Sequence, residues 1–198
     1  MSELSVGSLS GLAANSYVID VASGSSLDLS NATDLPASAL PAGSILQVVS
    51  VAKTDTFTTP SGTFVDVTDF NVSITPSSTA NTLLISYQAY LGNTNANSGA
   101  VLSFTNAADT VLFSADAAGS RNVGTSGFNF QTTDSPLNAY SVAGTFVHSP
   151  STTSAFTVKG RLRASNGGIA CFGRSGNDGD AAVRFRGPGS LVVMEVAG

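Results

Sequence analysis

Charged side chains are scarce in this chain, since only 21 of its 198 residues are acidic or basic. It has one His, one Cys, two Glu, two Lys and no Trp. Enzymes gather titratable groups in a cleft because proton transfer needs side chains whose pKa can be tuned. Ser and Thr, in contrast, supply 50 residues. The composition therefore predicts a stiff, hydrogen-bonded and passive protein, not an enzyme.

The residue types that most often carry chemistry stand alone. Cys171 excludes an internal disulfide, and its apolar surroundings predict a buried, inert thiol. His148 has no partner nearby in sequence, so we expect a structural or surface role. The acidic loop Gly176–Asp180 lacks EF-hand spacing and predicts an ordinary turn. With no zinc ligand set, P-loop or nucleophile elbow, we expect no catalytic residue, metal or cofactor.

Carboxylates show no sign of the pairing that glycoside hydrolysis uses. The eleven Asp are scattered, mostly in turns or on polar strand positions such as Asp66 and Asp69. Residues far apart in sequence could still meet in the fold, but nothing in the spacing indicates such a pair.

Long apolar runs are also missing. None approaches the ~18 residues that a membrane helix needs. The opening MSELSVGSLSGL has neither a basic start nor a continuous apolar stretch, so no secretory signal is expected. The sequence predicts no membrane-spanning segment.

The net charge of −5 is unevenly distributed. Residues 1–158 carry ten acidic and two basic groups (−8), and residues 159–198 carry three acidic and six basic groups (+3). This overall acidity argues against nucleic-acid binding, which needs a basic footprint. The basic region of one copy could meet the acidic part of a neighbour, or it could simply be solvated.

From Ser44 onward, apolar residues recur with a period of two, which indicates strands. Turn-rich segments at 93–99, 115–127 and 175–180 separate them, and no window has helical periodicity. About eight to ten short strands in one domain predict an all-β, jelly-roll-type antiparallel sandwich. The expected strands are 45–51, 64–75, 83–91, 101–105, 110–114, 140–148, 155–163, 169–174 and 190–196.

One of these strands changes phase. Val65 and Val67 fall on one face of segment 64–75, and the apolar residues from Phe70 onward fall on the other. A bulge or bend near Thr68–Asp69 would re-aim the side chains, as at the corners of sandwich strands.

The most specific candidate for function is a basic row. Lys159, Arg161 and Arg163 alternate with apolar residues or Gly, so they share the outer face of one strand at a spacing of ~7 Å. The row could bind carboxylates of another protein or, less favoured, an anionic saccharide. It could equally be a solvated face that discourages edge pairing.

The last strand is apolar on both faces, unlike a strand with one wet face. Its outward residues Val192, Met194 and Val196 would then be covered by another subunit, most simply near a threefold axis. The alternative is an ordinary central strand beneath a long loop.

Residues 1–44 differ from the rest of the chain. They hold short apolar pieces, notably Tyr17, Ile19 and Val21, between Ser/Gly/Asn-rich stretches. Such a segment buries little by itself, so it predicts an arm ordered by a partner or, alternatively, a disordered tail. Residues 45–198 form the second domain.

Nearly the whole chain resembles a module common in virion proteins of bacteriophages, especially phages of aquatic bacteria. The matching stretches are YVIDVASGSSLDL, PAGSILQVVSVAKTDTF, FVDVTDFNVSITPSSTANTLLISYQAYLG, the AAGSR turn, HSPSTTSAFTVKGRLRAS and LVVMEVAG.

The resemblance implies a compact homotrimeric jelly-roll without a cofactor, found as the terminal domain of tail or head fibres. With about 44 residues before the domain and no long shaft, we expect a capsid decoration or cement protein, or a short head fibre. Its arm would bind the major capsid protein or another virion protein. The protein would be made in the host cytoplasm and located in the virion.

The alternative is a tail-fibre tip that recognises a host-surface receptor, either a glycan or a protein. Its contacts would come from the polar loops 93–99 and 115–138. The absence of Trp and the placement of the four Tyr mainly in expected strands argue against a glycan platform.

Overall fold

The computed structural model describes residues 40–129 and 137–198. This part of the chain consists of strands, turns and loops, with no helix, so none is available to cross a membrane. The strands in chain order are β1 (Ile45–Lys53), β2 (Phe57–Thr59), β3 (Val65–Ile74), β4 (Thr82–Asn93), β5 (Gly99–Thr105), β6 (Val111–Phe113), β7 (Ser126–Asn129), β8 (Tyr140–His148), β9 (Phe156–Ser165), β10 (Ala170–Phe172) and β11 (Gly189–Val196).

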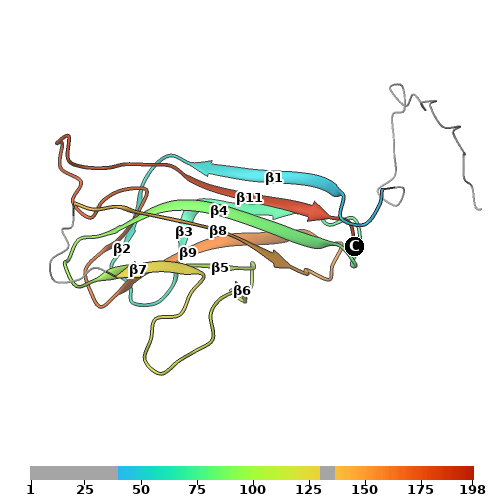
Figure 1. The fold of residues 1–198 in the computed structure, drawn as a ribbon, viewed down its shortest axis with the longest axis horizontal. Helices are drawn as coiled ribbons and strands as arrows, with labels where there is room; N and C mark the ends of the chain where they lie inside the picture. Colours follow the sequence, from blue (N-terminus) through green and yellow to red (C-terminus); the bar gives the residue numbers. More distant parts are fainter. Residues whose placement is uncertain (1–39, 130–136) are drawn as a thin grey trace, which may run out of the picture. The chain divides into compact units, whose positions relative to one another are not determined.

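The strand order confirms the predicted jelly-roll. One sheet contains β1, β11, β4 and β8 side by side, and the other contains β3, β9 and β5 with β6 and β7 beyond (Figure 1). The pairing is nested and antiparallel: β1 pairs with β11, β3 with β9, β4 with β8, and β5 with β7. Such nesting is what results when one long antiparallel ribbon is rolled into two facing sheets, as in jelly-rolls.

Two short strands extend the first sheet. Leu91 of β4 pairs with Tyr140 of β8 on one side and with Phe172 of β10 on the other. β10 therefore lies on the same edge of β4 as β11, and β2 pairs with β10.

Aromatic rings fill the space between the sheets. Phe70 lies 4.8 Å from Phe172 between ring centroids, and Tyr87 lies 4.6 Å from Phe104. Gly160 makes room for Phe70, because a Cβ at this position would lie 2.3 Å from the ring. Each fully buried large apolar side chain contributes roughly 1.5–3 kcal/mol, so this cluster is a major source of stability.

The predicted phase change in β3 is confirmed. The β3–β9 register shifts between Asp66 and Asn71, and Asp69 has a φ of 57°. The bulge allows both Val67 and Phe70 to point into the core although they are an odd number of residues apart. Val65, which the pattern placed on the same face as Val67, is 37% exposed because it lies at the open end of the strand.

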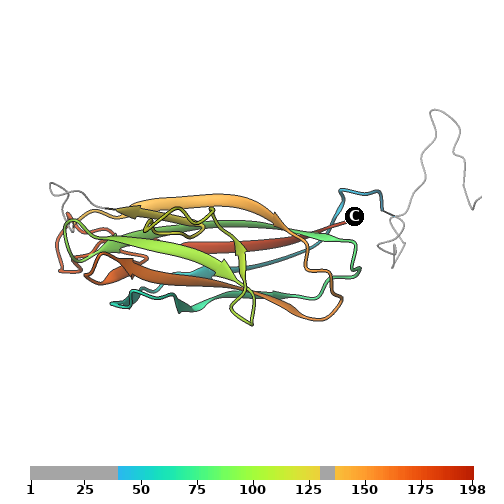
Figure 2. The ribbon, with the colours of Figure 1, turned by 90° about the horizontal axis from the view of Figure 1, so that it is seen from below.

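The sandwich has two distinct ends. The start of β1 and the end of β11 lie together, with the Gly43 amide donating to Ala197 O at 2.8 Å. The loops that follow β1, β4 and β9 all lie at the opposite end, as Figures 1 and 2 both show. The chain thus enters and leaves the sandwich at one end and presents its long β10–β11 connection at the other.

The sequence located most strands but missed two. β2 was not expected, and β7 falls largely in a segment expected to be a loop. Both are three or four residues long, too short to show a period. β1 begins at Ile45, immediately after the expected boundary, but residues 1–39 lie outside the described part and the two-domain division stays a prediction.

Candidate functional site

The basic row lies on the outer face of β9, as expected. Val158, Gly160 and Leu162 point into the core. Lys159, Arg161 and Arg163 alternate with them and therefore face outward. We call Asp66, Asp109, Lys159, Arg161 and Arg163 together the charged face.

The cations of this row bind carboxylates of the same chain. Lys159 Nζ donates to Asp66 Oδ2 at 2.9 Å and to Asp109 Oδ1 at 2.6 Å. Arg161 Nε lies 2.8 Å from Asp66 Oδ1, at ion-pair distance but without hydrogen-bond geometry, and its Nη1 lies 3.2 Å from Asp109 Oδ2. The two carboxylates and two cations therefore form one closed cluster.

Arg163, the third cation of the row, binds residues of two loops. Arg163 donates to Gly62 O at 3.1 Å and to Asn122 Oδ1 at 2.5 Å, and its guanidinium carbon lies 5.3 Å from the centroid of the Phe64 ring. All three cations are thus engaged within one chain. A contact between this row and a second copy or an anionic glycan stays a prediction.

Asp66 and Asp109 are the pair of carboxylates that sequence spacing could not reveal. A glycosidase acid needs a raised pKa. Here the hydrogen bond from Lys159, assisted by the charges of Arg161 and Lys159, lowers the pKa of Asp109 despite partial desolvation. The geometry holds this carboxylate ionised, which is unsuited to proton donation.

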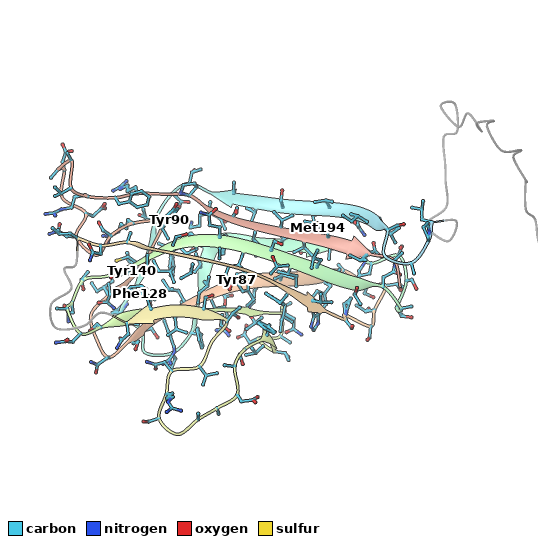
Figure 3. The ribbon with its side chains drawn as sticks, viewed as in Figure 1. Tyr87, Tyr90, Phe128, Tyr140 and Met194 are labelled. Carbon is cyan, nitrogen blue, oxygen red and sulfur yellow. The ribbon has the colours of Figure 1, made fainter. Side chains whose placement is uncertain are left out.

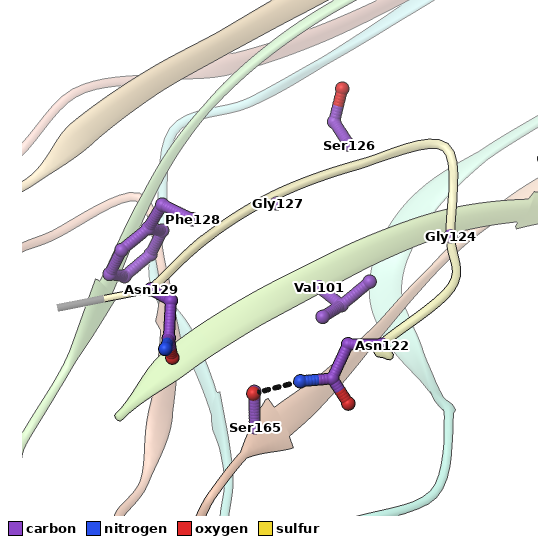
Figure 4. A pocket seen from close by; sticks show the side chains of 8 residues that line it. All are labelled: Val101, Asn122, Gly124, Ser126, Gly127, Phe128, Asn129 and Ser165. Carbon is purple, nitrogen blue, oxygen red and sulfur yellow. Dashed lines mark hydrogen bonds between the residues drawn. The ribbon is translucent and has the colours of Figure 1, made fainter. Parts of the chain in front are cut away.

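A cavity of about 320 Å³ opens beside the charged face (Figure 4). Three of its polar side chains are already paired: the Asn122 amide donates to Ser165 Oγ, and Ser126 Oγ hydrogen-bonds Tyr87 Oη at 2.5 Å. Phe128 stacks on Tyr140 with centroids 4.8 Å apart, and Figure 3 labels both rings. The cavity offers a ligand few free polar groups and no open aromatic platform.

The outer face of the other sheet carries no charge. Strand register aligns its outward residues in three rows of four across β1, β11, β4 and β8. We call these twelve residues the uncharged face: Val48, Met194, Leu84 and Val147; Ser50, Val192, Ser86 and Thr145; Ala52, Ser190, Gln88 and Ala143.

The first row of this face is entirely aliphatic or thioether. Met194, labelled in Figure 3, and Leu84 are half-buried, whereas Val48 and Val147 at the two edges are 55% and 59% exposed. In the second row, Ser86 and Thr145 hydrogen-bond each other at 2.9 Å. The face combines exposed apolar groups with hydroxyls of which some are already paired.

Within the described residues, the last strand, β11, is fully buried on its inward face and only partly buried on its outward face. β11 is central in its sheet, and Leu191, Val193 and Glu195 are buried. Val192, Met194 and Val196 stay half-exposed, so no loop among the described residues covers them fully. Their burial by another subunit stays a prediction.

Glu195 is a buried carboxylate that the sequence pattern did not single out. It accepts hydrogen bonds from the Ser77 amide (2.6 Å), Ser77 Oγ (2.9 Å), Asn81 Nδ2 (2.6 Å) and Gln47 Nε2 (2.5 Å). Burial alone would raise its pKa, but these donors together lower it. The network joins β1, the β3–β4 loop and β11 at the end where the chain enters and leaves the sandwich.

Cys171, His148 and Asp178 each lie in a defined local environment. Cys171 is fully buried, which raises the pKa of its thiol, and burial lowers the pKa of His148, whose ring stacks on Phe156. Asp178 binds Arg186 through two hydrogen bonds of 2.9 and 2.6 Å. Over the described residues, no group of three or more His, Cys, Asp or Glu side chains could hold a metal. The arm residues Tyr17, Ile19 and Val21 lie outside the described part.

No family model matches the chain, and neither does any curated protein. Among solved structures, it is similar to that of infectious bursal disease virus Gt strain (13% identity, 79% of this chain and 39% of that chain, TM-score 0.38) and Gx strain (16%, 76% and 40%, TM-score 0.36). It is also similar to T=1 particles derived from a mutant VP2 protein of that virus (14%, 77% and 36%, TM-score 0.37). The chain spans less than half the length of these proteins. TM-scores this low carry no argument about function, and the jelly-roll assignment rests on the strand order.

Proposed function

We propose that this chain is a non-enzymatic structural protein of a bacteriophage virion. It would be a homotrimeric capsid decoration or cement protein, or a short head fibre, attached to a virion protein through residues 1–44. The proposal begins with the resemblance of the sequence to a phage virion module. A sandwich with little reactive chemistry suits such a mechanical task.

The observation that carries the proposal is the separation of the two ends of the sandwich. Because β1 begins beside the end of β11, an arm preceding Leu40 reaches the domain at the end opposite the long loops. Anchoring by the arm would leave those loops facing away from the particle. Three arms acting together would give avidity even if each one binds weakly.

Deleting residues 2–35 tests the role of the arm. The truncated protein should fold and remain trimeric, and it should no longer attach to particles lacking the native protein. Full-occupancy decoration by the truncated protein, counted by electron microscopy, would show that the arm is not the anchor.

Receptor binding is the second candidate function, and one observation favours it. Val183 and Phe185, in the long loop before β11, are 67% and 42% exposed. Apolar side chains at the end away from the arm could contact a host-surface protein. Purified protein that blocks phage adsorption would support this function, whereas weakened particles upon its removal would support decoration.

A further inference from the structure

We propose that the uncharged face and its two flanking strand edges join three copies of this chain in a closed ring, with β1 of each copy beside β8 of the next. This inference rests on the trimer proposed above and specifies which surface forms it.

The charge distribution favours a second copy of this chain as the partner of the uncharged face. Every charged side chain of the described residues lies off this face: Lys53 and Glu195 of the same sheet point inward and are buried. Burying a charge without a partner is costly. A second copy of the same uncharged surface imposes no such cost, whereas a charged partner would lose solvation without finding a counter-ion.

Two edges of this sheet have no strand partner. Within the described residues, β1 pairs only with β11, and beyond Tyr140 β8 pairs only with β4. Exposed edges are normally protected by charges, Pro, bulges or short length. β8 has no charged residue, no Pro and no register shift in its pairing with β4. β1 has a register shift between Ile45 and Gln47 and the inward-pointing Lys53 at its end, so its unprotected stretch is Val48–Ala52.

The edges of the other sheet show the protection that β8 and the middle of β1 lack. β3 carries Asp66, Asp69 and a bulge, and β6 and β7 are three and four residues long. This contrast favours β8 and Val48–Ala52 of β1 as the stretches that contact another chain.

The directions of the strands are compatible with a ring. The four strands are successively antiparallel, so β1 and β8 run in opposite directions. A rotation axis parallel to the strands therefore brings β1 of one copy antiparallel to β8 of the next. Such a head-to-tail contact closes into a ring of three when each copy is rotated by a third of a turn from the next. Val48 and Val147, the most exposed residues of the apolar row, lie on these two edges. The ring also places all three chain-entry ends on the same side.

Crosslinking tests the ring directly. In a Cys171→Ala background, the double variant Val48→Cys/Val147→Cys is treated with a short bismaleimide. We expect covalent products of two and three chains, with three as the limit. Either single variant should give no covalent trimer. The control pair Asn71→Cys/Ser114→Cys, on exposed positions of the other sheet, should stay uncrosslinked.

Sedimentation velocity provides the independent measurement. Val147→Asp should convert the trimer to a folded single copy at micromolar concentration, whereas Asn71→Asp should leave it a trimer. Covalent dimers as the limit, or a wild-type protein that sediments as one copy, would overturn the ring. A Val147→Asp protein that remains trimeric would overturn this surface. Attachment of the same variants to particles is scored separately, so failure of the ring is distinguishable from failure of the virion function.

Discussion

The two outer faces of this sandwich treat their side chains in opposite ways. The acidic and basic side chains of the charged face bind one another within the chain, so few of their charges are available to a partner. Within the part of the chain that the structure describes, the uncharged face has no charged side chain, and its apolar row and two strand edges are not covered. The row of three cations is conspicuous in the sequence, but its charges are already bound within the chain. The face that no motif marked is the one with exposed apolar side chains and open strand edges.

A charge placed in the centre of the uncharged face should have the largest effect. Met194→Lys would put an ammonium into a contact with no counter-ion, and we expect trimer affinity to fall at least about 100-fold because desolvating an unpaired charge costs several kcal/mol. Analytical ultracentrifugation over a concentration series measures this change. Ser73→Lys on the other sheet is the matched control, and an equal loss there would remove the distinction between the two faces.

Glu195→Gln should have the next largest effect, on the stability of the fold. The amide would direct a donor at a site where Ser77, Asn81 and Gln47 already donate. We expect a loss of about 2–3 kcal/mol in the free energy of unfolding, because buried charge-assisted hydrogen bonds are replaced by a poor match. Urea titration measures it, and Asp116→Asn, exposed in the loop after β6, controls for the simple loss of one negative charge.

Acid should weaken the fold through the same carboxylate. The pKa of Glu195 is lowered in the folded state, so its contribution is fully present above the unfolded value near 4.5 and disappears as the pH falls through the folded value. Wild-type stability should therefore drop below about pH 5 more steeply than that of Glu195→Gln. Parallel slopes for the two proteins would mean that Glu195 contributes no pH dependence.

The smallest effect is expected on the charged face. Asp109 is half-exposed, so solvent and salt screen its ion pairs with Lys159 and Arg161. Asp109→Asn should lower Tm slightly in dilute buffer and leave it unchanged in 1 M salt. A large drop in Tm that persists at high salt would show that the cluster is a main source of stability.

The sequence predicted the parts of this fold that depend on alternation. The nine expected strands, the bulge near Asp69 and the outward direction of Lys159, Arg161 and Arg163 follow from a period of two, whereas β2 and β7 do not. The partners of that row do not, because Asp66 and Asp109 are 93 and 50 residues away from Lys159 in sequence. Tertiary pairing, not local pattern, brings them together.

Glu195 is a second residue whose partners could not be predicted from the sequence. Its position in an apolar strand suggested no polar role, yet it shares the inward face with Leu191 and Val193. Its donors come from β1 and from the loop after β3, which the sequence gives no means of placing beside β11. The uncharged face likewise emerges only when four strands are brought into register.

The paired entry and exit of the chain has a practical consequence for engineering. A foreign peptide fused after Gly198 would emerge beside the start of β1. If residues 1–44 are the anchor, as proposed, the peptide would compete with it for space. The same peptide inserted into the turn after β4, near Asn95, would emerge at the opposite end of the sandwich, away from the proposed anchor.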